Sequence, residues 1–164
     1  LDSQGQLIEG KRVSELTKED INNRNADGLK SFYPYFVYTD QKSGEKSYAI
    51  HVSGMGLWSV VKGYLAIKSD FRTIKGLAIY DHLETPGLGG EVEKPWFLDQ
   101  FHGKTLKDLD GNRKTFRVLK PSATVDDASV HGPSGATMTS NGMTKFINSD
   151  FAVYDKHFSA MKGS

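Results

Sequence analysis

The sequence predicts an α+β domain in which helices pack on one curved antiparallel sheet. Candidate strands follow one another between about residues 34 and 81, with no candidate helix among them. The chain then ends in a long segment whose apolar residues recur at three- and four-residue spacing, which is the period of one helix face. Strands in a consecutive run, rather than in alternation with helices, are typical of the α+β class. With 164 residues, the chain is long enough for one domain with its own core, and we expect residues 1–164 to form a single domain.

Composition excludes several function classes. The net charge is +1 and the basic residues form no patch, so nothing indicates a nucleic-acid partner. The chain has no cysteine, which excludes disulfides, thiolate metal sites and cysteine nucleophiles. No apolar run approaches the ~20 residues of a membrane-spanning helix. The five histidines lack the spacing of a metal-binding pair, and we expect no metal site.

The first half of the chain supplies the predicted sheet. Residues 1–32 are polar and form an N-terminal extension, within which residues 14–24 favour a short helix capped by Ser14 or Thr17. Beyond them, runs rich in valine, isoleucine, tyrosine and phenylalanine alternate with turn residues, as strands do. The predicted strands are 34–40, 47–52, 58–68 and 73–81.

We expect the segment after the predicted sheet to form loops and short secondary-structure elements. Residues 82–92 form a glycine-rich loop, and Pro95 suits the first position of a short helix that continues to Phe101. Two further runs, 104–109 and 114–119, flank Asp110-Gly111-Asn112. Turn residues between two such runs favour a β-hairpin.

A turn rich in hydroxyl groups lies before the last predicted helix, which we expect from about Ser140 to Met161 after an irregular loop over residues 121–133. The turn reads Ser134-Gly135-Ala136-Thr137-Met138-Thr139. Unpaired N–H groups and the helix dipole make a helix N-terminus a suitable site for a phosphate, and small residues leave room for a ligand. The alternative is that these hydroxyls only cap the helix, and the spacing alone does not decide between the two.

This turn resembles the flavinylation motif of the FMN-binding domain family, Ser-Gly-Ala-Thr followed by x-Thr. In that family the threonine after Gly-Ala is esterified to the phosphate of FMN. The resemblance therefore implies covalent FMN on Thr137, with Thr139 as the second candidate. An acidic residue often precedes the acceptor by six positions in the family, and this chain has His131 there.

Two more segments resemble the same family. The loop that begins at Glu84 is similar to a Glu-Thr-Pro-Gly-Leu-Gly signature beside the isoalloxazine ring, and Gly56-Leu57-Trp58 is similar to a block that adds an aromatic residue to the flavin pocket. Taken alone, the loop would be read as a turn and Trp58 as a core residue. The three segments stand in the family's order, and the similarity spans about residues 45–160. The resemblance implies no catalytic residue and a cofactor site made of Gly56, Leu57, Trp58, Glu84, Thr85, Leu88, Gly89, Ser134, Gly135, Ala136, Thr137 and Thr139.

Three shorter segments favour one branch of the family. Residues 90–92, 95–97 and 101–104 resemble the C subunits of sodium-translocating NADH:quinone reductases. That resemblance implies a one-electron carrier inside a membrane complex, a flavin transferase that installs FMN, and an N-terminal membrane helix that places the domain on the periplasmic side of a bacterial inner membrane. Two alternatives stay open. One is a G-type relay subunit of a ferredoxin–NAD oxidoreductase complex, and the other is a noncatalytic periplasmic binding or adaptor domain in which Thr137 only caps a helix.

Overall fold

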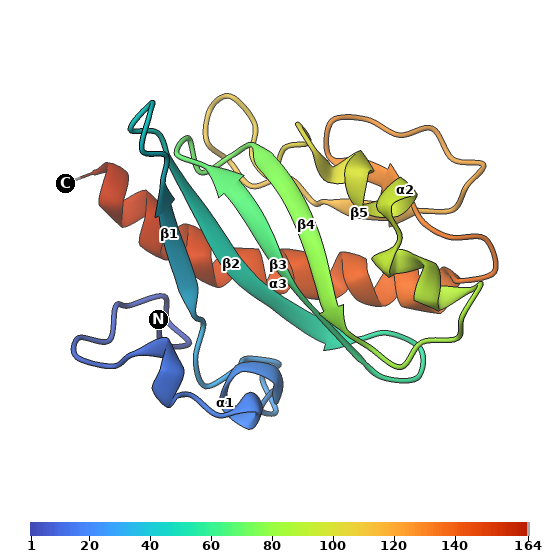
Figure 1. Cartoon of the computed structure of the whole chain (residues 1–164), viewed down its shortest axis with the longest axis horizontal. Coiled ribbons are helices and arrows are strands. Elements are labelled where there is room, and N and C mark those ends of the chain that lie inside the picture. Colours follow the sequence, from blue (N-terminus) through green and yellow to red (C-terminus); the bar gives the residue numbers. More distant parts are fainter. Residues whose placement is uncertain (164) are drawn as a thin grey trace.

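The computed structural model describes residues 1–163, and its centre is a four-stranded antiparallel sheet in the order β1-β2-β3-β4 (Figure 1). Each strand pairs with the next one along the chain, so local hairpins alone build this sheet. The α+β class is confirmed, and the four predicted strands lie within a few residues of the observed ones. These are β1 (Tyr35–Thr39), β2 (Lys46–Met55), β3 (Val60–Lys68) and β4 (Ile74–Asp81).

One long helix, α3 (Thr137–Lys162), crosses one face of the sheet (Figure 1). The central strand β2 is buried at most positions on both faces. β3 alternates as a strand covered on one face should, because Val61, Leu65 and Ile67 are fully buried while their neighbours are partly exposed. The apolar stripe of α3 packs against this face through Met143, Phe146, Ile147, Phe151, Tyr154 and Phe158.

The helix begins at Thr137, three residues before the predicted start at Ser140. Residues 139–142 read Thr-Ser-Asn-Gly, which are weak helix formers, so sequence propensity favours a later start. Packing overrides this preference, because Thr139 and Ser140 are buried in the first turn. Helix α3 also passes very close to the sheet, since a Cβ atom on Gly142 would lie 2.1 Å from the carbonyl oxygen of Met55.

The N-terminal extension contains less helix than predicted. A 3-10 turn at Val13–Glu15 and α1 (Lys18–Asn22) replace the single helix expected over residues 14–24. Thr17 caps α1 as predicted, because its hydroxyl accepts a hydrogen bond from the N–H of Asp20 at 3.2 Å, and the Asp20 carboxylate in turn accepts the N–H of Thr17 at 2.9 Å. This capping box requires extended backbone at Thr17, which separates the two short elements.

A buried ion cluster attaches the extension to the rest of the fold. Asp150, on α3, is fully buried and accepts hydrogen bonds from Arg24 Nη2 and Lys30 Nζ, both at 2.6 Å. The same carboxylate accepts the N–H of Ser53 on β2 at 3.0 Å. The extension therefore packs as part of the domain, next to the sheet and α3.

The hairpin predicted over residues 104–119 forms only near its turn. Lys107 and Arg113 pair in an antiparallel bridge, and the N–H of Lys114 bonds the carbonyl of Leu106 beside it. The second run then takes a different partner, because the strand β5 (Arg117–Leu119) pairs in parallel with β6 (Ser129–His131). Strand β6 lies in the segment expected to be an irregular loop. The chain does turn between the two runs. However, β5 pairs with a strand further along the chain, and turn composition carries no signal for such a non-local pairing.

Short helical elements fill the space between β4 and β5. They are a 3-10 segment at Gly89–Glu93, α2 (Pro95–Leu98) and a 3-10 turn at Asp99–Phe101. Pro95 occupies the first position of α2, as predicted. Within residues 1–163, no helix is both long and apolar enough to cross a membrane.

Candidate functional site

Three predicted segments meet at the N-terminus of α3, and Glu84 joins them. Its carboxylate is buried and accepts the N–H groups of Leu57 at 3.0 Å and Trp58 at 2.9 Å, in the turn between β2 and β3. Ser59, in the same turn, donates both its N–H at 3.0 Å and its hydroxyl at 3.2 Å. From the other side, the hydroxyl of Thr139 in the first turn of α3 donates to Glu84 Oε2.

These contacts keep Glu84 ionised. Burial by itself would raise the pKa of its carboxyl group. The hydrogen bonds from Thr139 and from the backbone of residues 57–59 oppose burial more strongly, and they lower the pKa to about 2 from an ordinary 4.5. Glu84 is therefore a fixed buried anion at neutral pH, and it binds the turn before β3 to the first turn of α3.

Two predicted glycines leave space for this arrangement. A Cβ atom on Gly56 would lie 2.8 Å from Glu84 Cδ, and one on Gly89 would lie 2.5 Å from Thr139 Oγ1. Both distances are well inside van der Waals contact. Glycine is therefore needed at both positions so that Glu84 and Thr139 can pack closely, which is a structural role and not a contact with a cofactor.

The loop that contains Leu88 packs on the turn before α3. Gly135 has a φ of +68°, and a Cβ atom there would lie 2.9 Å from Leu88 Cδ2. The carbonyl of Thr85 closes the loop by accepting the N–H groups of Leu88 at 3.1 Å and Gly90 at 2.9 Å. The side chain of Thr85 is exposed and is not among the contacts that join the three segments.

The N-terminus of α3 is open. Its N-cap is Ala136, which cannot supply a side-chain cap, and the first N–H bonded inside the helix is that of Ser140, to Ala136 at 2.9 Å. Among residues 1–163, the N–H groups of Thr137, Met138 and Thr139 have no acceptor. The interpretation of the hydroxyls as helix caps is therefore wrong, and the open N–H groups suit an anion.

The two candidate threonines differ in environment. The side chain of Thr139 is buried, with 1% of the residue exposed, and its hydroxyl is bonded to Glu84. Thr137 is exposed, and its hydroxyl has no hydrogen-bond partner within the part of the chain that the structure describes. Of the two threonines, it is Thr137 that presents its hydroxyl to the surface beside the open N–H groups.

A hollow of about 350 Å³ lies beside Thr137. It is lined by Ser134, Gly135 and Ser140 and also by Lys120. A second hollow of about 380 Å³ shares Ser134 and includes Gly87, Glu91, Trp96 and His131. Neither Lys120 nor Trp96 was predicted for the site. The segment that carries Lys120 reaches it through the pairing of β5 with β6, for which the sequence gives no signal.

The predicted walls of the flavin pocket are only partly assembled. Leu57, Trp58 and Leu88 expose large apolar side chains, and Met138, which was not predicted, does the same between the two threonines. Exposed apolar groups gathered at one end of a domain mark a binding surface. Leu57 and Trp58 do not line the hollow that contains Thr137, and their hydrogen bonds to the site are those of their backbone N–H groups to Glu84.

Comparison with known proteins gives consistent matches. Residues 56–150 match the family described as FMN-binding domain. The chain is 45% identical over 98 residues to the C subunit of the Na(+)-translocating NADH-quinone reductase of Yersinia pestis, covering 59% of this chain and 36% of that protein. It is 43% identical over 150 residues to the corresponding C subunit of Vibrio anguillarum, covering 90% of this chain and 55% of that protein.

Two solved structures share the fold. The C subunit from Parabacteroides distasonis superposes with a TM-score of 0.80 at 31% identity, over 97% of this chain and 75% of that one. NqrC from Shewanella oneidensis superposes with a TM-score of 0.75 at 35% identity, over 90% of this chain and 68% of that one. The chain spans 36% of the length of the first curated relative and 55% of the second. The chain belongs to the FMN-binding domain family and, within it, to the family of C subunits of Na(+)-translocating NADH-quinone reductases.

Proposed function

We propose that this domain carries FMN through a phosphoester to Thr137 and serves as a one-electron carrier of a Na⁺-translocating NADH:quinone reductase. One observation supports the acceptor most strongly. Thr137 offers an exposed, unpaired hydroxyl beside open N–H groups, whereas Thr139 is buried and bonded to Glu84. Membership of the FMN-binding domain family supports FMN as the cofactor.

The residues around Thr137 fit a phosphate. The N–H groups of Thr137, Met138 and Thr139 lie at the start of a 26-residue helix, whose dipole favours an anion by about 0.3–1 kcal/mol at an exposed site. Lys120 supplies a positive charge at the wall of the same hollow. The new bond joins Thr137 Oγ1 to phosphorus, a P–O bond of the flavin donor's phosphate breaks, and the departing oxygen takes up the hydroxyl proton, so the protein gains the mass of FMN less one water.

The chain's own residues hold and shield the cofactor, and FMN supplies the electron-transfer chemistry. Leu57, Trp58, Leu88 and Met138 offer apolar cover around the attachment site, and Thr85 offers an exposed hydroxyl for the polar edge of the ring. A flavin that exchanges electrons with partners must stay near the surface, where noncovalent retention is weak. A phosphoester allows the flavin to be both exposed and retained, because a covalently bound flavin cannot dissociate.

The remaining parts of the proposed function rest on the resemblance to the family. We propose that other subunits of the reductase are the electron donor and acceptor, that a flavin transferase installs the group, and that an N-terminal helix holds the domain at the periplasmic side of the membrane. The matched relatives are C subunits, which favours this assignment over a G-type relay of a ferredoxin–NAD oxidoreductase complex. A noncatalytic adaptor in which Thr137 caps the helix is disfavoured, because no side chain caps α3.

Intact-mass measurement after co-expression with a flavin transferase tests the proposal. We expect a gain of one FMN less water in the unmodified chain and in Thr139→Ala, and no gain in Thr137→Ala. Circular dichroism of each variant shows whether it is folded. Labelling that persists in Thr137→Ala and disappears in folded Thr139→Ala would overturn the assignment. No adduct in any folded form would favour the adaptor alternative.

A further inference from the structure

Glu84 is a buried charge without a counter-ion. The residue is 4% exposed, and within residues 1–163 no lysine, arginine or histidine forms an ion pair with it. The other buried aspartate and lysine side chains do have partners, because Lys30 pairs with Asp150 and Lys107 pairs with Asp155. Buried charges are usually paired in this way, since an isolated charge is costly to remove from water. Glu84 is therefore the exception among the described residues.

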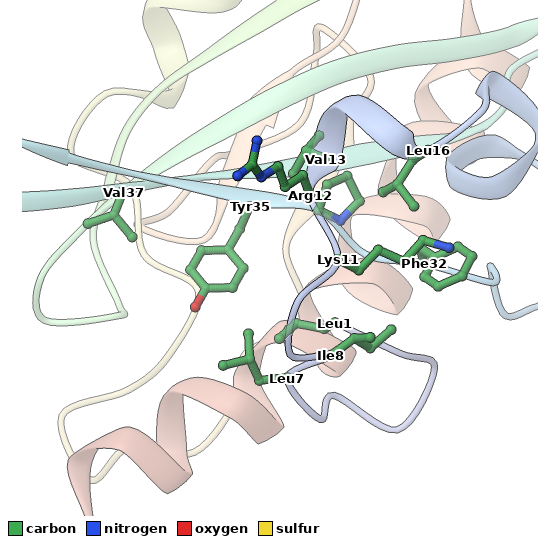
Figure 2. Close-up of a pocket in the computed structure, with 11 residues that line it drawn as sticks. Leu1, Leu7, Ile8, Lys11, Arg12, Val13, Leu16, Phe32, Tyr35 and Val37 are labelled. Atoms are coloured by element: carbon green, nitrogen blue, oxygen red, sulfur yellow. The ribbon is translucent and has the colours of Figure 1, made fainter.

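Charged groups at surface hollows differ from Glu84, because water screens them. At the hollow between the N-terminal extension and β1, for example, Lys11 and Arg12 are exposed to solvent (Figure 2). The field of such charges is weakened by water and by salt. Glu84 has almost no contact with water, so its field acts mainly through the protein interior.

Neutral donors, and not cations, hold the carboxylate of Glu84. It accepts hydrogen bonds from three backbone N–H groups and two hydroxyl groups, which come from Leu57, Trp58, Ser59 and Thr139. Burial opposes ionisation, but these bonds outweigh it and lower the pKa of Glu84 to about 2. They do not cancel its charge, because every donor is neutral. The domain therefore keeps a net negative charge at this place at neutral pH.

The donors place this charge beside the proposed flavin site. Thr139 lies two residues after Thr137, in the same first turn of α3. Leu57 and Trp58, whose N–H groups bond the carboxylate, carry side chains that are among those proposed to cover the flavin. Single hydrogen bonds therefore join the carboxylate both to the attachment segment and to the apolar cover.

We propose that the charge of Glu84 opposes the uptake of an electron by FMN, and so lowers the potential at which the domain accepts and donates electrons. The inference rests on the proposed function, since it needs FMN on Thr137. An electron adds negative charge to the flavin, and a buried anion nearby disfavours that addition. At an effective dielectric constant of about 20, a charge about 10 Å away changes such an equilibrium by about tenfold. Glu84 then has a second role besides joining three segments of the fold.

Spectroelectrochemical titration of the FMN-loaded domain tests this inference, after intact mass has shown that each variant carries FMN. Glu84→Gln removes the charge, and we expect the ratio of reduced to oxidised flavin at a fixed applied potential to rise about threefold to tenfold. The rise should persist at high salt, because salt screens a buried charge little. Glu45→Gln removes an exposed carboxylate in the turn between β1 and β2, and it should leave the ratio unchanged.

Ser59→Ala is the control for a change in local structure. It removes one hydroxyl donor to Glu84 and keeps the charge, so the ratio should not rise. An unchanged or lower ratio in Glu84→Gln, or an equal rise in Ser59→Ala, would overturn this inference and leave covalent FMN standing. An unlabelled chain would refute the proposed function and this inference together.

A second measurement needs neither FMN nor a folded variant of Glu84. The ¹³C NMR signal of the Glu84 carboxyl carbon in the unmodified domain should stay at its ionised position from neutral pH to about pH 4, because its pKa is about 2. Uptake of a proton at pH 4.5 or above would show that Glu84 is not a fixed anion, and the inference would fall.

Discussion

The hydroxyl of Thr139 donates a hydrogen bond to the carboxylate of Glu84, which lies 55 residues earlier in the chain. The same carboxylate accepts the N–H groups of Leu57 and Trp58. One buried anion therefore connects the first turn of α3, the loop after β4 and the turn before β3. Because the hydroxyl of Thr139 is bonded to Glu84, Thr137 is the one of the two threonines whose hydroxyl is exposed at the helix N-terminus.

Removing the charge of Glu84 should destabilise the domain. In Glu84→Gln the amide presents an NH₂ group where N–H donors already point at the side chain, so at least one buried donor loses its acceptor. We expect the free energy of unfolding to fall by about 2–4 kcal/mol, since bonds to a charged group are involved. Urea titration measures the change. Glu91→Gln is the control and should change stability little, because Glu91 is partly exposed and its carboxylate accepts a hydrogen bond from the indole N–H of Trp96. Equal stability of the two variants would contradict the role given to Glu84.

The same carboxylate should make stability depend on pH. Its pKa is about 2 in the folded domain and 4.5 ordinarily, so the unfolded chain binds the proton more tightly. The stabilisation is complete above pH 4.5 and is lost as pH falls towards 2, amounting to about 2 kcal/mol between neutral pH and about pH 3. Urea titrations of the unmodified chain and Glu84→Gln across this range isolate the effect. The difference between the two proteins should shrink as pH falls, and a constant difference would refute the assignment.

Alanine at Gly142 should destabilise a helix that alanine normally favours. Replacing glycine in a helix interior gains about 1 kcal/mol from propensity. Here the new Cβ atom would lie 2.1 Å from the carbonyl oxygen of Met55, and forced overpacking costs about 1–3 kcal/mol or more. We expect a net loss in Gly142→Ala by thermal unfolding. Gly76→Ala in β4, where a Cβ atom meets nothing within 4 Å, should be neutral or stabilising. A gain in Gly142→Ala would show that α3 does not approach β2 this closely.

Neutralising Asp150 should loosen the N-terminal extension. Asp150→Asn leaves Lys30, whose side chain is fully buried, without its counter-ion and weakens the bond to Arg24. Breaking one side of a buried ion pair costs about 3–5 kcal/mol. Hydrogen exchange should accelerate first at residues 24–33, and Asp110→Asn at an exposed turn serves as the control. Unchanged exchange in the extension would mean that the cluster does not hold it.

The sheet was predictable because its strand pairings are local in sequence. Each strand pairs with its sequence neighbour, and alternating burial in β3 leaves a clear period of two. The pairing of β5 with β6 was missed because parallel partners are joined by a connection that carries no turn signature. The early start of α3 was missed because burial of Thr139 and Ser140, a tertiary effect, stabilises a turn of weak helix formers.

The residues proposed for the site come from resemblance, which does not give the physical role of each one in the fold. The resemblance placed Glu84, Gly56 and Gly89 in a flavin pocket, whereas the structure shows Glu84 buried among backbone N–H groups and both glycines packed against Glu84 or Thr139. From sequence alone, a carboxylate in a loop is expected to be exposed to solvent, because its hydrogen-bond donors lie in segments far away in the chain. Lys120 was missed for the same reason.

Covalent attachment of FMN at Thr137 can be tested by peptide mapping, using mass spectrometry of protein purified from its native membrane. We expect the peptide that contains Thr137 to carry FMN less one water, and fragmentation to place the added mass on Thr137 and not on Thr139. An unmodified peptide at that position, or an added mass located on Thr139, would refute the assignment of Thr137 as the acceptor.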